Sequence, residues 1–185
     1  MGQLSRILIW MATPALIYFG LQYLRPSAVA AMLALLLVLR HRKVAHTFLA
    51  GVQRFEVGVL IALLTLMLGT IVTDSERLLR LYPVAVNLGM ALVFGLTLAR
   101  PPSMIERFAR LQEPDLPEQG VRYTRQVTAA WVVFLLVNGA IALYTAVLSS
   151  REVWALYNGL IAYGLMGAMF AGEWLVRRWV RGPSP

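Results

Sequence analysis

QVTAAWVVFLLVNGAIALYTAVL, Gln126 to Leu148, is a long apolar run that carries no charged side chain. An α-helix rises about 1.5 Å per residue, so a run of this length covers the roughly 30 Å of hydrocarbon in a bilayer. Trp131 lies near one end of the run, in the region where aromatic rings anchor membrane helices. The run therefore predicts a transmembrane helix.

Five further apolar runs accompany this one, at residues 7–24, 26–39, 55–73, 81–99 and 153–176. The sequence thus predicts an all-α fold, a polytopic bundle of six transmembrane helices that forms a single integral membrane domain over residues 1–185. The run 26–39 is short because Arg25 and Arg40 bound it. It either spans a locally thinned bilayer or pairs with the first helix as a re-entrant hairpin.

The composition agrees with a membrane protein. Hydrophobic residues make up 59% of the chain and charged residues 14%, and the mean hydropathy is +0.67. The chain has no cysteine, which excludes disulfides and thiolate chemistry. Basic flanks that face anionic lipid account for the net charge of +8, so we expect no nucleic-acid partner.

The basic residues predict how the six helices are oriented. With a cytoplasmic N-terminus, thirteen of the 17 Lys and Arg residues fall on the cytoplasmic side, and the other side holds Arg25, Arg77, Arg80 and Arg151. This distribution follows the positive-inside rule and places both termini in the cytoplasm. The outer segment 74–80 reads as a solvated turn.

Polar and small residues recur inside the apolar runs. Asn87, Asn138 and Asn158 each lie in a different run, and the last two are followed by glycine. Such residues join membrane helices by hydrogen bonds and close packing. Alternatively, the three asparagines line a polar cavity near mid-membrane. Gly164 and Ala168 have the spacing of a small-residue seam, through which the protein could form a homo-oligomer.

Two acidic residues are expected at the cytoplasmic interface. Glu56 can pair with Arg54, and Glu173 with Arg177, as interfacial salt bridges. The alternative is a basic pocket in which three arginines hold a phosphate or carboxylate of a lipid: Arg54, Arg107 and Arg110.

No catalytic constellation, metal site or cofactor motif is visible. His41 and His46 are five residues apart, which places them on different faces of a helix and makes a poor metal pair. We therefore predict no catalytic residues, no metal and no cofactor, and retain a lipid-modifying enzyme only as a third hypothesis.

The longest polar segment is the cytoplasmic loop 100–125. Pro101 and Pro102 end the preceding helix, and Ser103 can cap a new one. The apolar residues that follow share one face, namely Met104, Ile105, Phe108 and Leu111, and the polar ones share the other, namely Glu106, Arg107, Arg110 and Gln112. We expect a short amphipathic helix that lies in the membrane interface.

Several patterns together suggest a family. They are the basic turn LRHRKVA at 39–45, the segment 105–108 after the prolines, Leu116-Pro117, the stretch from Tyr123 to 134, Asn138-Gly139 with Ile141-Ala142, and Trp154. In these the chain resembles the intracellular septation protein A family of bacterial inner membranes (YciB). It departs in its arginine-rich C-terminal end and in the acidic EPDLPEQG of 113–120. It also resembles uncharacterised small membrane proteins that accompany fatty-acid-like and aryl polyene lipid pathways.

The resemblance implies an inner-membrane protein of cell envelope biogenesis and septation. Its partners would be membrane lipids and other inner-membrane envelope proteins, and it would act as a non-enzymatic scaffold. The alternative function is a small transporter of a lipid or lipid precursor, with the asparagine-bearing helices lining its groove.

Overall fold

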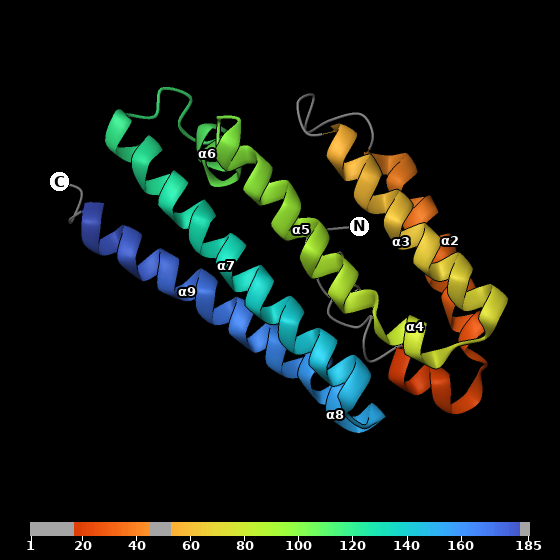
Figure 1. Ribbon diagram of the computed structural model, residues 1–185. Coiled ribbons are helices and arrows are strands. Elements are labelled where there is room, and N and C mark those ends of the chain that lie inside the picture. Colours follow the sequence, from red (N-terminus) through yellow and green to blue (C-terminus); the bar gives the residue numbers. More distant parts are fainter. Residues whose placement is uncertain (1–16, 45–52, 182–185) are drawn as a thin grey trace.

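The computed structural model describes residues 17–44 and 53–181, and within them the side chains of residues 17–38 and 57–178. Every element in these described ranges is a helix: residues 17–23, α2 (Pro26–Val44), α3 (Gln53–Thr73), α4 (Glu76–Arg80), α5 (Tyr82–Ala99), α6 (Met104–Arg110), α7 (Glu118–Leu148), α8 (Arg151–Leu156), the π-helical turn η1 (Tyr157–Ile161) and α9 (Ala162–Arg181). The expected all-α fold is confirmed for the described part of the chain (Figure 1).

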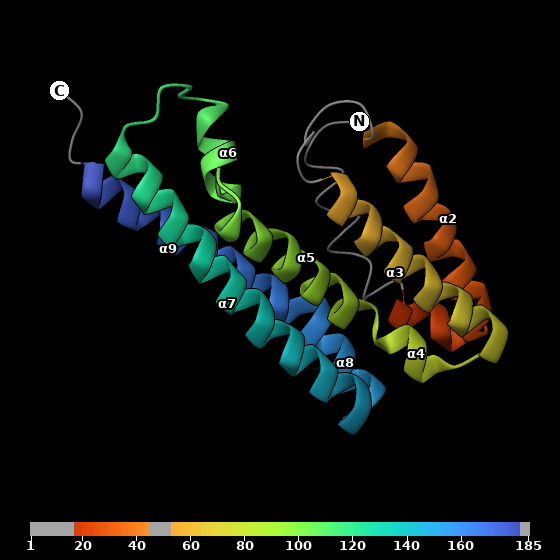
Figure 2. The same ribbon diagram turned by 45° about the horizontal axis from the view of Figure 1, so that its top comes forward.

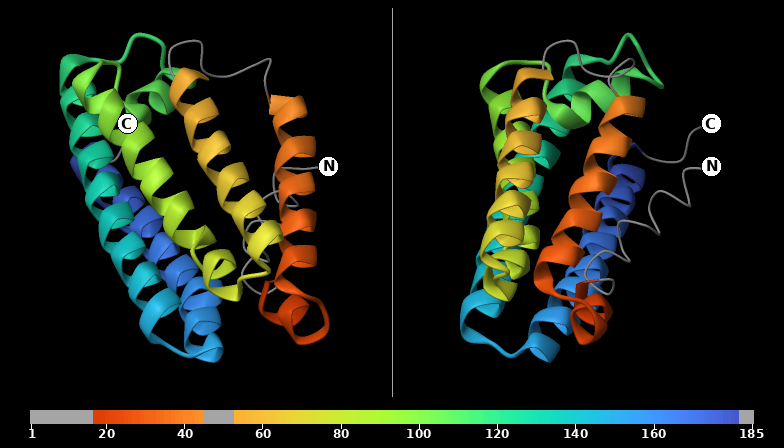
Figure 3. Two further views of the ribbon diagram at one scale, coloured as in Figure 1. Left: turned by 45° about the vertical axis from the view of Figure 1, so that its right-hand side comes forward. Right: turned by 90° about the vertical axis from the view of Figure 1, so that its right-hand side faces the viewer.

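The long helices lie side by side and alternate in direction (Figures 1 and 3). α2 packs against α3, α3 against α5, and α5 against α7, while α9 runs along α7. One end of the molecule carries α6, the segment 111–117 and the start of α7, and we call it the α6 end. The opposite end carries α4, α8 and the helical residues 17–23, and we call it the α4 end.

Three helical segments are long and apolar enough to cross a membrane, namely Glu76–Ala99, Glu118–Leu148 and Arg151–Arg178. They include three of the six expected runs. The apolar parts of α2 and α3, Pro26–Val38 and Val57–Thr73, are shorter. Most of the first expected run, 7–24, lies outside the described residues.

Several helices extend beyond the apolar runs that predicted them. α2 continues through the basic residues to Val44. Its 19 residues measure about 28 Å, so the helix is longer than the run 26–39 that predicted it. α7 begins at Glu118, with Pro117 as its N-cap, and residues 118–125 are therefore helix where we expected loop. Both differences have one cause, because charged side chains are compatible with a helix that continues past the hydrocarbon.

The core consists of two clusters. One lies toward the α4 end and includes Met67, Leu79 and Trp154, each with 0% exposure. The other lies toward the α6 end, around Phe94, Met104 and Trp131. Met104 comes from the expected amphipathic helix, so α6 packs into the bundle by its first residue.

Two glycines of α5 give a matched pair of substitutions. A Cβ at Gly89 would lie 2.5 Å from Cγ1 of Val59, whereas a Cβ at Gly95 meets nothing within 4 Å. We expect Gly89→Ala to lower the free energy of unfolding by about 1–3 kcal/mol, because the stiff valine must move. Gly95→Ala should leave it unchanged or raise it by up to about 1 kcal/mol through helix propensity. Thermal unfolding in detergent measures both, and equal shifts for the two variants would contradict the close α3–α5 contact.

Candidate interfacial binding pocket

A pocket of about 560 Å³ is lined by residues of α6, the start of α7 and the last part of α9. Figure 2 shows these three segments at the α6 end. The volume of the pocket lies within the range of about 300–1,000 Å³ that small-molecule sites occupy. The described residues that line it come from all three helices and from the segment 112–117. The pocket is therefore a product of tertiary packing.

α6 is held in place by hydrogen bonds to its first N–H groups. Ser103 is its N-cap, as the sequence predicted, and the Ser103 N–H donates to Oε2 of Glu106 at 3.2 Å. The N–H groups of Met104 and Ile105 donate to the hydroxyls of Thr97 on α5 (2.9 Å) and Thr128 on α7 (3.2 Å). These N–H groups have no partner within a helix, so the threonines both satisfy them and fix α6 over the pocket.

Aromatic rings line the pocket. The ring of Trp131 on α7 lies 4.6 Å from that of Phe170 on α9, between their centroids. Phe108 of α6 lines the same space, and its side chain is 47% exposed. A surface of this kind suits an acyl chain or another apolar group.

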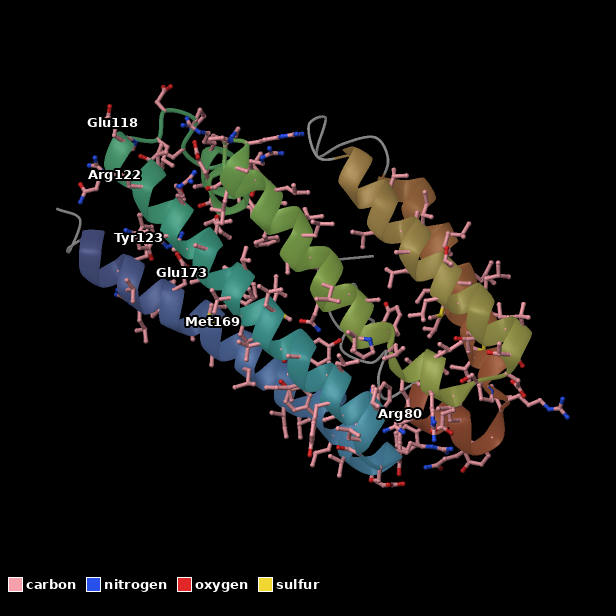
Figure 4. All side chains as sticks on the ribbon, viewed as in Figure 1. Arg80, Glu118, Arg122, Tyr123, Met169 and Glu173 are labelled. Atoms are coloured by element: carbon pink, nitrogen blue, oxygen red, sulfur yellow. The ribbon has the colours of Figure 1, made fainter. Side chains whose placement is uncertain are left out.

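Polar groups form the rim. The Tyr123 hydroxyl on α7 donates to the main-chain oxygen of Glu173 at 3.3 Å and lies 3.4 Å from its Oε1. Arg177 forms an ion pair with the same Oε1, from Nε at 3.5 Å. Figure 4 shows Tyr123 and Glu173 between α7 and α9. The expected pairing of Glu173 with Arg177 is therefore present, and it lies at the mouth of a pocket.

Two of the three arginines proposed from the sequence as an anion site, Arg107 and Arg110, make contacts away from the pocket lining. Nε of Arg107 donates to the Pro102 carbonyl at 2.9 Å. Arg110 donates from Nε to Oε1 of Glu106 and from Nη1 to the Pro114 carbonyl, both at 2.9 Å. Neither arginine lines the pocket. The side chains of Arg54 and Glu56 lie outside the described residues, although their backbone begins α3.

One residue of α6 is placed differently from expectation. Glu106 was assigned to the polar outer face, but it is only 5% exposed. Its carboxylate accepts from the Ser103 N–H and pairs with Arg110, and both contacts draw it inward. Phe108 and Leu111 remain largely exposed, as expected for a helix at an interface.

The three asparagines are buried and hydrogen-bonded between helices. Nδ2 of Asn138 donates to Oδ1 of Asn87 at 2.9 Å, and the Tyr157 hydroxyl donates to Oδ1 of Asn138 at 2.7 Å. This Asn87–Asn138–Tyr157 ladder joins α5, α7 and η1. Asn158 donates separately to the Thr145 hydroxyl of α7 at 3.2 Å. None of the asparagines lines the pocket, and sequence reasoning missed Tyr157 and Thr145 because nothing local marks them.

The segment expected as a solvated turn contains a buried arginine. Arg80 is 9% exposed, and its Nη2 donates to the carbonyls of Thr145, Ser149 and Ser150 at 2.9, 2.7 and 3.1 Å. Trp154 donates from Nε1 to the Arg80 carbonyl at 3.0 Å. The solvated-turn prediction is wrong for this residue, because Arg80 supplies the donors that the C-terminal carbonyls of α7 lack. Figure 4 shows it at the α4 end.

The rest of that segment connects other elements at the α4 end. Glu76 forms an ion pair with Arg151, with Oε1 at 2.9 Å from Nε. Asp74 has a φ of 50°, and its Oδ1 accepts from the Ser27 N–H at 2.8 Å. Hydrogen bonding to Ser27 lowers the pKa of the Asp74 carboxyl below its usual range. The segment 74–80 therefore connects α2, α4 and α8.

α9 is the least buried of the potential membrane helices. Of the most apolar part of Arg151–Arg178, only 6% is buried within the molecule. The corresponding share is 50% for Glu76–Ala99 and 39% for Glu118–Leu148. A Cβ at Gly164 or Gly167 would meet nothing within 4 Å. The small-residue seam predicted on this helix is therefore open and is not used inside the described chain.

Among the described residues, no three His, Cys, Asp or Glu side chains lie together as a metal site would require. His46 and the side chain of His41 lie outside those residues. In comparisons with protein families, curated proteins and solved structures, nothing matches this chain.

Proposed function

We propose that this chain is a multi-pass, non-enzymatic protein of the bacterial inner membrane that binds one amphiphilic lipid in the pocket at its α6 end. The observation that carries the proposal is the pocket itself, whose lining combines the aromatic rings of Trp131 and Phe170 with the polar groups of Tyr123, Glu173 and Arg177. An amphiphile offers an apolar chain for the first surface and a headgroup for the second. Lipid binding is the property that the transport hypothesis from the sequence requires.

The proposed orientation places the α6 end, and both termini, in the cytoplasm. Of the arginines whose side chains are described, seven lie in the segments of this end, namely Arg100, Arg107, Arg110, Arg122, Arg125, Arg177 and Arg178. Four belong to the α4 end, namely Arg25, Arg77, Arg80 and Arg151. The positive-inside rule then supports a cytoplasmic α6 end and, with the first expected run, six crossings.

The test is native mass spectrometry of protein released from mild detergent, with Ala109→Phe as the blocking variant. Ala109 lines the pocket, and a phenyl group there fills the space for the chain. We expect one bound lipid per wild-type chain and at least about a tenfold lower occupancy in the variant. Ala140→Phe on the exposed side of α7 is the matched control. An equal lipid content in all three proteins would overturn the proposal.

A second candidate function is the envelope scaffold suggested by the family resemblance, and the exposure of α9 favours it. Its open small-residue face, with Gly164 and Gly167, suits a helix of another inner-membrane protein. A photo-crosslinker at Ala168 should then give a discrete crosslinked protein in cell membranes. The same probe at Leu92, which is 53% exposed on α5, is the control. Crosslinking only to lipid from both positions would count against the scaffold.

A further inference from the structure

We propose that the pocket selects a lipid whose headgroup carries a primary ammonium, such as a zwitterionic ethanolamine phospholipid, over an anionic lipid. This rests on the proposed function, since it names the class of ligand for the same pocket. It differs from the alternative drawn from the sequence, in which Arg54, Arg107 and Arg110 hold an anionic headgroup.

The first argument is charge. The chain has 17 basic and nine acidic residues, yet the ionisable Asp, Glu, Lys and Arg residues that line the pocket are Glu113, Glu173 and Arg177. Asp115 lies in the segment that connects α6 to α7, and Glu118 begins α7. Both are exposed and adjacent in sequence to lining residues. Five arginines are adjacent in sequence to lining residues without lining the pocket themselves, namely Arg107, Arg110, Arg122, Arg125 and Arg178. Figure 4 shows Arg122 one turn into α7 from Glu118. The lining therefore carries an excess of negative charge in a strongly basic protein.

The second argument is the state of Glu173. Its side chain is 19% exposed, and both of its side-chain contacts fall on Oε1, at 3.4 Å from the Tyr123 hydroxyl and 3.5 Å from Nε of Arg177. Charge-assisted hydrogen bonds are typically about 2.7–2.9 Å long, so both contacts are long. A lipid ammonium at this carboxylate would gain a shorter bond than either present partner makes.

The third argument is the surroundings of that carboxylate. Tyr123 and Phe170 both line the pocket with Glu173, and so does Trp131, whose ring centroid lies 4.6 Å from that of Phe170. Aromatic faces attract an ammonium, most strongly where water is excluded. Arg177 is then placed to meet the phosphate of the same headgroup, with one ionic group for each charge of a zwitterion.

An anionic headgroup fits the same lining poorly. The arginine that lines the pocket is already paired with Glu173, and Arg110 is engaged by Glu106 and the Pro114 carbonyl. A lipid with negative charge alone would draw the guanidinium of Arg177 away from Glu173 and leave that carboxylate without a cation. The ammonium of an ethanolamine headgroup instead replaces the cation that its own phosphate draws away. Leaving a charge unpaired gives selectivity against the anionic ligand.

The experiment is a competition read by native mass spectrometry. Protein stripped of lipid receives equal amounts of dioleoyl phosphatidylethanolamine and dioleoyl phosphatidylglycerol, which differ in mass. We expect wild type to favour the ethanolamine lipid by about five- to tenfold. Glu173→Gln keeps the shape of the side chain but removes its charge, so it should bring the ratio of the two lipids to about one. Glu152→Gln is the control, because Glu152 is an exposed residue at the opposite, α4 end, and this variant should behave as wild type.

The outcomes separate the two proposals. If neither lipid binds in a manner sensitive to Ala109→Phe, the proposed function fails. If lipid binds there but wild type shows no preference or favours phosphatidylglycerol, the pocket stands and the ammonium assignment is overturned. Glycerophosphoethanolamine, the same headgroup without chains, is added as a further competitor. Displacement of bound lipid by it at equal concentration would show that the headgroup alone is the ligand and would overturn the lipid assignment.

Discussion

Arg80→Leu is expected to lower the free energy of unfolding by about 3 kcal/mol, the largest effect of any single change considered for this protein. The substitution removes the donor to three carbonyls at the end of α7 and leaves them without their partner. It also removes the cation that lies 6.0 Å from the centroid of the Trp154 ring. A hydrogen bond to a charged group contributes about 1.5–3 kcal/mol, and a single nitrogen serves all three carbonyls here, so the three bonds are not additive.

Arg77→Leu is the matched control for this prediction. Arg77 lies on the same short helix, α4, but its side chain is exposed. The change should alter the free energy of unfolding by less than about 0.5 kcal/mol. Reversible unfolding in mixed detergent micelles measures both variants. If Arg80→Leu and Arg77→Leu lose the same amount, the buried contact is not a source of stability.

Asn138→Leu is expected to lower the free energy of unfolding by about 2–3 kcal/mol. The variant deprives Oδ1 of Asn87 of its donor and the Tyr157 hydroxyl of its acceptor, both in a buried site. If Asn138 and Asn158 only lined a transport groove, leucine at either position would leave the bundle folded. The hydrogen bonds of Asn138 lead us to expect lower stability.

A double-mutant cycle gives the control for Asn138. Tyr157→Phe removes the hydroxyl that Asn138→Leu leaves unpaired, so the double variant should be more stable than the sum of the two single effects by about 0.5–1.5 kcal/mol. The same unfolding assay applies. Strictly additive effects would mean that the two side chains do not depend on each other in the folded protein.

The sequence predicted those features that depend on neighbouring residues. The uncharged run 126–148 lies within α7, and Ser103 begins α6 where the prolines end α5. In both cases the deciding residues are adjacent in the chain. The exact start of α7 was missed, since hydropathy marks the hydrocarbon boundary and a helix can continue beyond it with residues such as Arg122 and Arg125.

Features that depend on distant residues were not predictable in the same way. Arg80 reads locally as one more charge in a polar turn, and its role depends on carbonyls 65 to 70 residues later. Asn138 was recognised as polar, but its partners Asn87 and Tyr157 lie 51 residues before and 19 residues after it. The pocket is a further case, because it combines residues of α6, α7 and α9. A single sequence contains the side chains but not their pairing.

The contact between Arg80 and Trp154 also bears on how the protein is made. The two residues are 74 positions apart, so Arg80 leaves the ribosome well before its partner exists. At about 5–20 residues per second, the interval is roughly 4–15 s. During this time α5 and α7 can enter the bilayer, and Arg80 is solvated by water and lipid headgroups. The hydrogen bond from Trp154 to Arg80 can therefore form only after α8 has emerged from the ribosome, late in the synthesis of the chain.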